Sequence, residues 1–135
     1  MKKIVHFIFI CLFLVTFSSY GQESTPMQQV MTAHDEVMTK MPKLVKLINA
    51  LQPKVDTTQS GQKHQHAINS LKSSNSSMMK WMQGFGKRFT ADEMLKGKAL
   101  SDEKKEWLAE ENKKIEALRK EINASILKAE LLLDQ

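Results

Sequence analysis

The chain has 135 residues, a formal net charge of +5 and one cysteine, Cys11. A chain of this length is enough for one domain, and one cysteine excludes an internal disulfide. Because Cys11 lies inside the apolar leader described next, we expect the rest of the chain to have no thiolate ligand and no thiol nucleophile.

The first residues have the pattern of a secretory signal peptide. Two lysines are followed by an apolar stretch of about 14 residues, from 4 to 17. A membrane span needs roughly 20 apolar residues. Small residues then occupy the −3 and −1 positions of a cleavage site. We therefore predict a signal peptide over 1–21 and cleavage before Gln22; the alternative is an uncleaved N-terminal anchor.

The exported part, 22–135, has an uneven charge. It carries 18 cations and 15 acids, a net charge near +3. Residues 61–100 have seven cations and two acids, whereas residues 101–135 have seven cations and nine acids. We expect the basic segment to lie against the acidic one or against anionic surfaces. No nucleic-acid partner is expected for an exported bacterial protein, and no transmembrane span is expected after cleavage.

The first predicted helix covers about 26–52. Apolar residues recur there at spacings of three and four, as on one face of a helix. Its predicted stripe consists of Met27, Met31, His34, Met38, Met41, Val45 and Ile48, with Val30, Val37 and Leu44 beside it. Pro42 crowds the Met38 carbonyl and cannot donate to it, so the helix should bend or break near Met41. Either this kink only wraps the first helix around the others, or the freed carbonyl lies beside a site.

The second predicted helix covers 59–88 and follows a turn at 52–61 that is rich in turn-forming residues. Its predicted stripe consists of His64, Ile68, Leu71, Asn75, Met78, Met82, Phe85 and Phe89. Two glycines around Phe85 are expected to loosen the end of this helix and expose Phe85 and Phe89. His64 and His66 do not face each other on a helix, and we interpret them as surface or edge residues. An adventitious metal site is the alternative.

The third predicted helix covers 101–133, after a linker with one short turn around 92–95. Ser101 is the expected N-cap, and two acids follow in the first turn, where the helix dipole favours them. Alternating acids and bases along this helix are typical of a solvated face. Its predicted stripe consists of Leu108, Glu111, Ile115, Leu118, Ile122, Ser125, Ala129 and Leu132.

Together these segments predict an all-α fold. Almost no segment has the alternation of a strand, and short connections make neighbouring helices antiparallel. We therefore predict an elongated up-down-up three-helix bundle with coiled-coil-like heptads, roughly 45 Å long. Self-association along an exposed seam is a further expectation.

Methionines form two clusters, one on each of the first two helices. The clusters are Met31, Met38 and Met41, and Met78, Met79 and Met82. In an antiparallel hairpin, residues whose numbers sum to about 112 face each other. His34 is then expected opposite Met78, and Met31 opposite Met82.

Thioethers and imidazole are soft ligands that suit Cu(I). The candidate metal ligands are therefore His34, Met31, Met38, Met78 and Met82. Alternatively, the methionines only fill irregular space in a helical core. Histidine–methionine ligation of a b-type haem is a third possibility, for which a three-helix core is small. Covalent haem is excluded because the chain has no CxxCH motif.

No catalytic pattern is recognisable in the sequence. There is no nucleophile elbow and no glycine-rich phosphate loop after a strand. Asp35 and Glu36 are adjacent on a helix and cannot converge on one substrate atom. We therefore expect no enzyme, but an exported helical protein that contacts itself, an envelope protein or the cell surface. The expected contact surface is the basic second helix with Phe85 and Phe89. A periplasmic Met/His Cu(I)-binding protein for metal handling is the alternative.

Three segments resemble a family of small exported bacterial proteins, many of them lipoproteins, that often carry the label "viral A-type inclusion protein". The segments are HDEVMTKM (34–41), MMKWMQGF (78–85) and KGKALSDEKKEWL (96–108). The resemblance extends over most of the exported part and implies an exported helical protein without established chemistry or site residues. The family usually has a lipidation cysteine after its apolar run, whereas Cys11 lies within that run, which argues against a lipid anchor.

Overall fold

The computed structural model describes residues 24–134, and these form helices without any strand, which confirms the all-α expectation for this part. The elements are α1 (Pro26–Met38), α2 (Met41–Leu51), the short 3-10 helix η1 (Gln52–Lys54), α3 (Gln59–Arg88), α4 (Ala91–Leu95) and α5 (Asp102–Leu133). The predicted signal peptide, 1–21, and its cleavage before Gln22 lie outside the described residues. None of the helices over 24–134 combines the length and apolar character that a membrane crossing requires.

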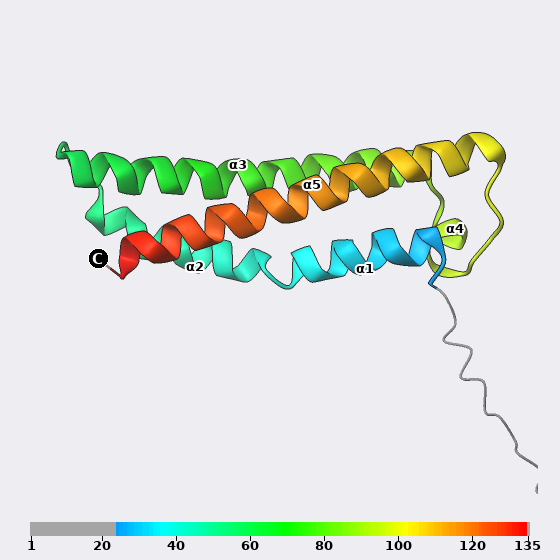
Figure 1. Cartoon of the computed structure of the whole chain (residues 1–135), viewed down its shortest axis with the longest axis horizontal. Helices are drawn as coiled ribbons and strands as arrows, with labels where there is room; N and C mark the ends of the chain where they lie inside the picture. Colours follow the sequence, from blue (N-terminus) through cyan, green and yellow to red (C-terminus); the bar gives the residue numbers. More distant parts are fainter. Residues whose placement is uncertain (1–23, 135) are drawn as a thin grey trace, which may run out of the picture.

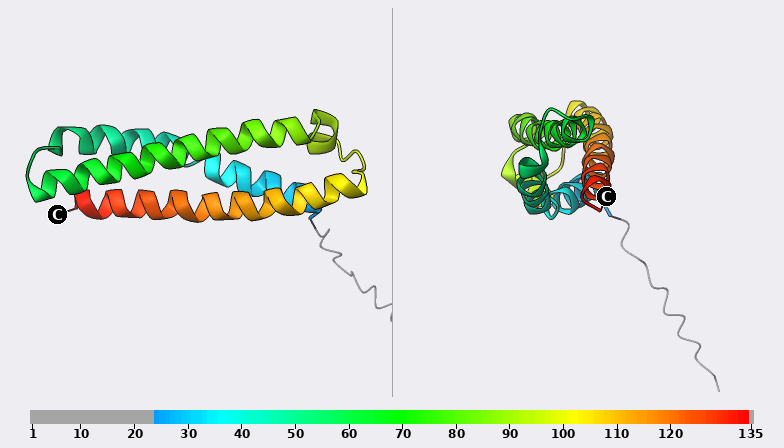
Figure 2. Two further views of the ribbon diagram at one scale, coloured as in Figure 1. Left: turned by 90° about the horizontal axis from the view of Figure 1, so that it is seen from above. Right: turned by 90° about the vertical axis from the view of Figure 1, so that its left-hand side faces the viewer.

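The helices lie side by side in an elongated rod. α1 and α2 follow one another along one side, α3 runs back, and α5 runs again in the direction of α1 (Figure 1). Seen end-on, these three layers surround a common axis (Figure 2). α5 packs along α3 and along the α1–α2 arm, and α4 closes the end at which α1 begins.

The first arm is two helices where one helix over 26–52 is expected. α1 ends at Met38 and α2 begins at Met41, next to Pro42. A tight turn joins them, in which the Lys40 N–H donates to the Val37 carbonyl at 2.9 Å. Pro42 then falls in the first turn of α2, where its missing N–H would have no partner within the helix. The proline is therefore accommodated by a new helix start.

Hydroxyl side chains begin four of the helices. Thr25, Thr58, Thr90 and Ser101 precede α1, α3, α4 and α5. Each side-chain oxygen accepts a hydrogen bond from the backbone N–H three residues further on, which satisfies a donor that the helix itself leaves free. These local bonds fix where the helices start.

In the first arm, the buried face consists mainly of residues that lie beside the predicted stripe on the helix surface. Its core residues are Met27, Val30, Ala33, Val37, Leu44, Leu47 and Leu51. Most of the predicted stripe, including Met31, Met38, Met41 and Ile48, is half-buried at the edge of this core. Val45, which was expected inside, is 58% exposed. The arm is rotated because α1 packs mainly on α5, which turns Val30 and Val37 inward.

The predicted stripes of the two long helices are mostly buried. In α3, Asn75 is exposed and the adjacent Ser74 takes its place inside, while Met82 is half-buried. In α5, every predicted stripe residue is buried except Leu132, which is half-buried. Ser74 and Ser125 meet at the crossing of the two helices, with their hydroxyl oxygens 2.9 Å apart. These small residues allow the two backbones to approach closely.

The end of α3 remains helical through Arg88, so the expected exposure of Phe85 and Phe89 is wrong. Both rings are buried. The Phe85 ring stacks on Trp81 with 4.8 Å between centroids, and Phe89 lies 4.8 Å from Phe85. Because residues four apart share a helix face, the three rings form one aromatic column inside the rod.

The turn between α2 and α3 also differs from expectation. His64 is buried, with Nδ1 3.1 Å from the Lys54 carbonyl oxygen, whereas His66 is exposed. Asp56 accepts hydrogen bonds from the Thr58 hydroxyl and backbone N–H, and these hold the pKa of Asp56 below its ordinary value. A Cβ atom on Gly61 would lie 2.4 Å from the Asp56 backbone nitrogen, so this turn needs a glycine.

We predict that Gly61→Ala destabilises the protein by about 1–3 kcal/mol, because the backbone of Asp56 must move to admit the methyl group. Gly84→Ala is the matched control. Gly84 is inside α3 and has no atom within 4 Å of an added Cβ, so this change should stabilise by about 0.5–1 kcal/mol. Urea unfolding of both variants measures the difference. Equal effects of the two substitutions would contradict the close approach at Gly61.

Candidate functional site

His34 lies between α1 and α3. Its side chain is 20% exposed, and its ring centroid is 6.0 Å from that of Trp81 on α3. The sequence expectation placed it opposite Met78, three residues earlier. His34 therefore faces the methionine-bearing part of α3, with an indole as its nearest aromatic neighbour.

The predicted methionine ligands lie along the same two helices. Met78 is fully buried, and Met31, Met38 and Met82 are half-buried against the core. Met31 and Met38 lie three residues before and four residues after His34, so they flank it on one face of α1. Met78 lies one turn before Trp81 on α3. Met79, by contrast, is 49% exposed and belongs to the outer face.

Asp35 orients the histidine. Its Oδ1 lies 2.8 Å from Nδ1 of His34. When Nδ1 carries the proton, it donates to this carboxylate and leaves Nε2 with a free lone pair, which is the arrangement that second-shell carboxylates give to metal-binding histidines. Because Asp35 and His34 are adjacent in the chain, this hydrogen bond can form within α1 alone, without a contact from another helix.

Trp81 carries an unusual buried group. Its Nε1 is the only buried side-chain nitrogen or oxygen in residues 24–134 that has no hydrogen-bond partner. A buried donor without a partner costs roughly 1–3 kcal/mol. The indole is packed between His34 and Phe85. The spacing of Trp81, Phe85 and Phe89 is the sequence signal that could have located this column.

Within the described part of the chain, no three His, Cys, Asp or Glu side chains are placed to hold a metal ion together. A metal ion between α1 and α3 would therefore depend on the thioethers and His34. That requirement selects a soft, low-coordinate ion and disfavours hard cations such as Mg²⁺.

Two buried acids form ion pairs near the end of the rod at which α1 begins. Glu111, on α5, lies 3.0 Å from Nη1 of Arg88 and 2.8 Å from Nζ of Lys114. Arg88 also bonds Glu110 at 2.7 Å, which raises the pKa of Arg88 and lowers the pKa of Glu110. The guanidinium lies 5.4 Å from the Trp107 ring centroid, so it joins the end of α3 to α5 in several ways.

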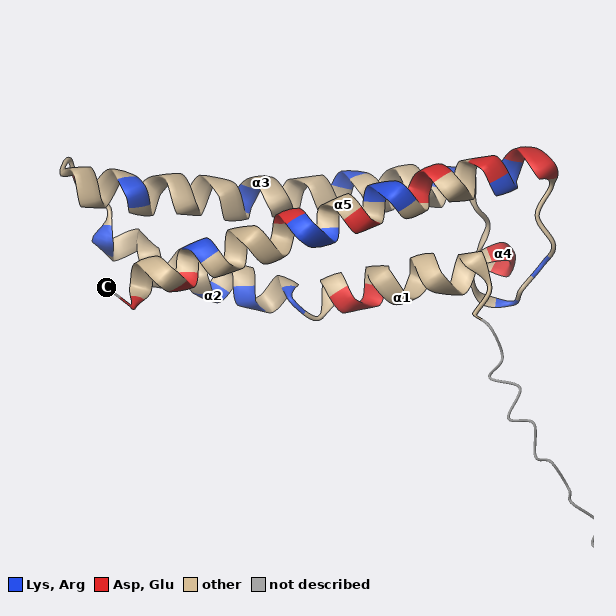
Figure 3. Ribbon diagram, viewed as in Figure 1, with Lys and Arg blue, Asp and Glu red and all other residues tan. Residues whose placement is uncertain are grey.

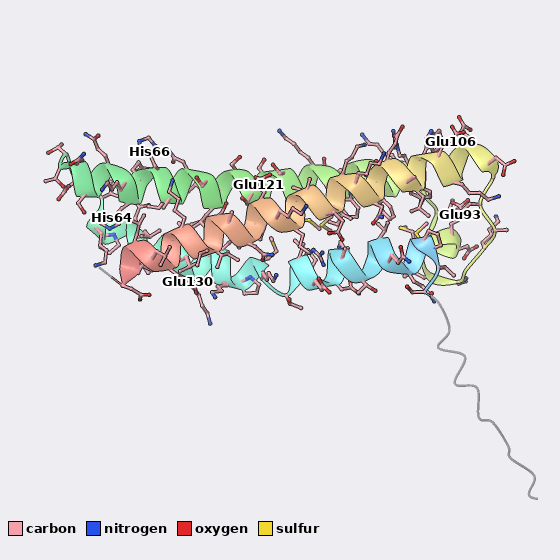
Figure 4. All side chains as sticks on the ribbon, viewed as in Figure 1. His64, His66, Glu93, Glu106, Glu121 and Glu130 are labelled. Carbon is pink, nitrogen blue, oxygen red and sulfur yellow. The ribbon has the colours of Figure 1, made fainter. Side chains whose placement is uncertain are left out.

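The other buried acid, Glu93, connects α4 to α5 (Figure 4). Its side chain is 7% exposed and both carboxylate oxygens accept from Nζ of Lys104, at 2.8 and 2.7 Å. The Thr90 backbone N–H donates to it at 2.8 Å. The Lys104 hydrogen bonds, followed by that of Thr90, lower the pKa of Glu93 to about 2. The Glu93 carboxylate is therefore ionised at neutral pH and stabilises the contact between α4 and α5.

The rod has a hollow near each end. A cavity of about 510 Å³ lies beside Glu93, and its apolar lining includes Met27, Leu100 and Leu108. A groove of about 540 Å³ lies between α3 and α5 at the opposite end. Seven residues line the groove: Lys63, His66, Ala124, Leu127, Lys128, Leu131 and Leu132. The sequence analysis did not identify this groove, although the apolar end of α5 is visible in the sequence ILKAELLL (126–133).

Comparisons with models of protein families, with curated proteins and with solved structures give no match to this chain. The function is therefore argued from the residues themselves.

We predict that Glu93→Gln lowers the thermal stability at neutral pH and flattens the acid limb of the stability curve. The folded pKa of about 2 lies below the ordinary value of 4.5, so this carboxylate stabilises the fold above pH 4.5 and loses that effect as the pH falls toward 2. Thermal melts between these pH values compare the variant with wild type. Glu106→Gln, which removes an exposed acid near the same end, is the control and should retain the wild-type slope. An unchanged acid limb in Glu93→Gln would contradict the anchoring role.

Proposed function

We propose that this protein is a non-enzymatic, exported three-helix bundle that acts by contact with a component of the cell envelope. The observation that carries this proposal is an exposed apolar ridge on α5. Leu127 and Leu131 are 57% and 56% exposed, and they lie four residues apart on one face of the helix. Exposed leucines that adjoin a groove are typical of a contact site.

The ridge differs from the other exposed apolar side chains. In residues 24–134, the remaining large hydrophobic residues with exposed side chains are Val45, Met79 and Leu95, and these lie on three different elements. Only Leu127 and Leu131 form a pair on one helix. Because Phe85 and Phe89 are buried, this pair replaces them as the apolar part of the contact surface.

The charge of α3 supports contact with an anionic partner. α3 contains five cations and no acid (Figure 3). Four of them, Lys63, Lys72, Lys80 and Lys87, are exposed, and none has a carboxylate within ion-pair distance among the described residues. Their positive charge is available to a partner.

Export is supported by the sequence pattern of the leader and by the resemblance to small exported helical proteins. Cys11 is the only cysteine of the chain, so an oxidising compartment would expose no thiol of the exported part. The absence of a thiol also suits the second candidate function given below.

We expect the protein recovered from bacterial cells to begin at Gln22 and to crosslink to an envelope component. Intact mass and fractionation after crosslinking on whole cells measure both properties. Leu131→Ser should reduce the crosslinked yield, while Val45→Ser, which changes an exposed residue of α2, should not. A protein that retains residues 1–21 in the cytoplasm, or one that stays monomeric without any crosslink, would contradict the proposal.

The second candidate function is Cu(I) binding between α1 and α3. The specific observation in its favour is the oriented imidazole of His34, held by Asp35 and facing Trp81 and the methionine-bearing part of α3. Two or three thioethers from Met31, Met38, Met78 and Met82 would complete the coordination.

Fluorescence can test this candidate because the chain has only two tryptophans. In a Trp107→Phe background, Trp81 is the only reporter, and we expect anaerobic Cu(I) to quench it with one ion per chain. Competition with a Cu(I) chelator gives the affinity. His34→Ala and Met78→Leu should each weaken it about tenfold or more, whereas Met79→Leu, on the outer face, should leave it unchanged. Equal affinities in all of these variants would eliminate the site.

A further inference from the structure

We propose that the groove between α3 and α5 is a binding site for anionic phospholipid at a membrane surface. This inference rests on the proposed contact function and names the envelope component. The groove has a volume of about 540 Å³ and lies where α3 begins and α5 ends, at the end of the rod remote from α4. His66 marks its α3 side in Figure 4.

The apolar part of the groove is suited to the boundary between headgroups and acyl chains. Leu127 and Leu131 stand outward on the same face of α5, and the half-buried Leu132 lines the groove beside them. Amphipathic helices bind membranes by burying such side chains to a depth of roughly 5–10 Å. Leu127 and Leu131 are already exposed, so they can enter the boundary between headgroups and acyl chains without a rearrangement of the helices.

The charged part of the groove selects an anion. Lys63 and Lys128 are its only charged lining residues, and no acid lines it. Neither lysine has a carboxylate within ion-pair distance in residues 24–134. They come from different helices, so the fold places two cations beside one apolar surface. A phosphate headgroup would pair with these lysines while its acyl chain lies along the leucines.

The other possible occupants fit less well. A second copy of this chain, bound through the same groove, would bring four lysines together without acids between them, which opposes such a dimer. The groove has seven lining residues, whereas a stable protein interface uses about 20–30 residues on each side. Reversible binding to a membrane needs only a few apolar side chains and a local positive charge.

Sedimentation with lipid vesicles tests the inference. We expect the purified protein to bind vesicles of phosphatidylcholine with about one third phosphatidylglycerol, and to release them at high salt, but not to bind phosphatidylcholine alone. Lys63→Gln and Lys128→Gln should each weaken binding about fivefold. Leu127→Ser and Leu131→Ser should each weaken it about tenfold. All four side chains line the open groove, so the variants should keep the wild-type melting temperature.

Two control variants change the same residue types outside the groove. Lys46→Gln removes an exposed cation of α2, and Val45→Ser removes an exposed apolar side chain of the same helix; each should change vesicle binding less than twofold. No binding to anionic vesicles, or binding that the groove variants leave unchanged, would overturn the lipid site. If vesicles are not bound but Leu131→Ser still abolishes crosslinking to an envelope protein on cells, the contact function stands with a protein partner. Failure of both measurements would overturn both proposals.

Discussion

The close approach of α3 and α5 is the contact on which the rest of the structure depends. The hydroxyls of Ser74 and Ser125 meet there at 2.9 Å, and the small buried residues Ala67 and Ala129 lie further along the same two helices. The α1–α2 arm packs beside this pair of helices. α2 contacts both long helices, while α1 packs mainly on α5. Large side chains, among them the buried ring of Trp81, lie on the side of α3 that faces α1. His34 of α1 lies beside this ring, with 6.0 Å between the two ring centroids.

The ion pairs explain why the two ends of the rod differ. At one end, the buried carboxylates of Glu93 and Glu111 are each paired with cations and tie α4 and α3 to α5. Further along α5, Arg119 bonds Glu36 of α1 and Glu130 bonds Lys43 of α2, so two ion pairs join α5 to the first arm. The expected pairing of the basic segment with the acidic one is limited, on α3, to Arg88. The exposed lysines of α3 remain available, and this is the physical basis for an anionic partner.

The two candidate functions depend on different regions of the molecule. The Cu(I) hypothesis depends on the interior between α1 and α3, where thioethers, one imidazole and an indole without a hydrogen-bond partner are in contact with the core. The lipid hypothesis depends on the end of the rod remote from α4, where Leu127 and Leu131 of α5 remain exposed beside the groove. Because the two sites share no residue, a substitution in one leaves the other available as an internal control.

The sequence by itself determined the helical character and the starts of α1, α3 and α5, because spacing of three and four and hydroxyl N-caps act within a few residues. It also determined most of the buried faces of α3 and α5, because the predicted stripes of these helices are largely buried. Only the tertiary structure decided which face of α1 is buried. The stripe of Met31, His34 and Met38 and the stripe of Val30, Ala33 and Val37 are both helical, and packing on α5 selects the second. The groove at Leu127 and Leu131 was likewise decided by tertiary structure, because packing buries Ile126 and Ala129 of the same apolar stretch and leaves Leu127 and Leu131 exposed.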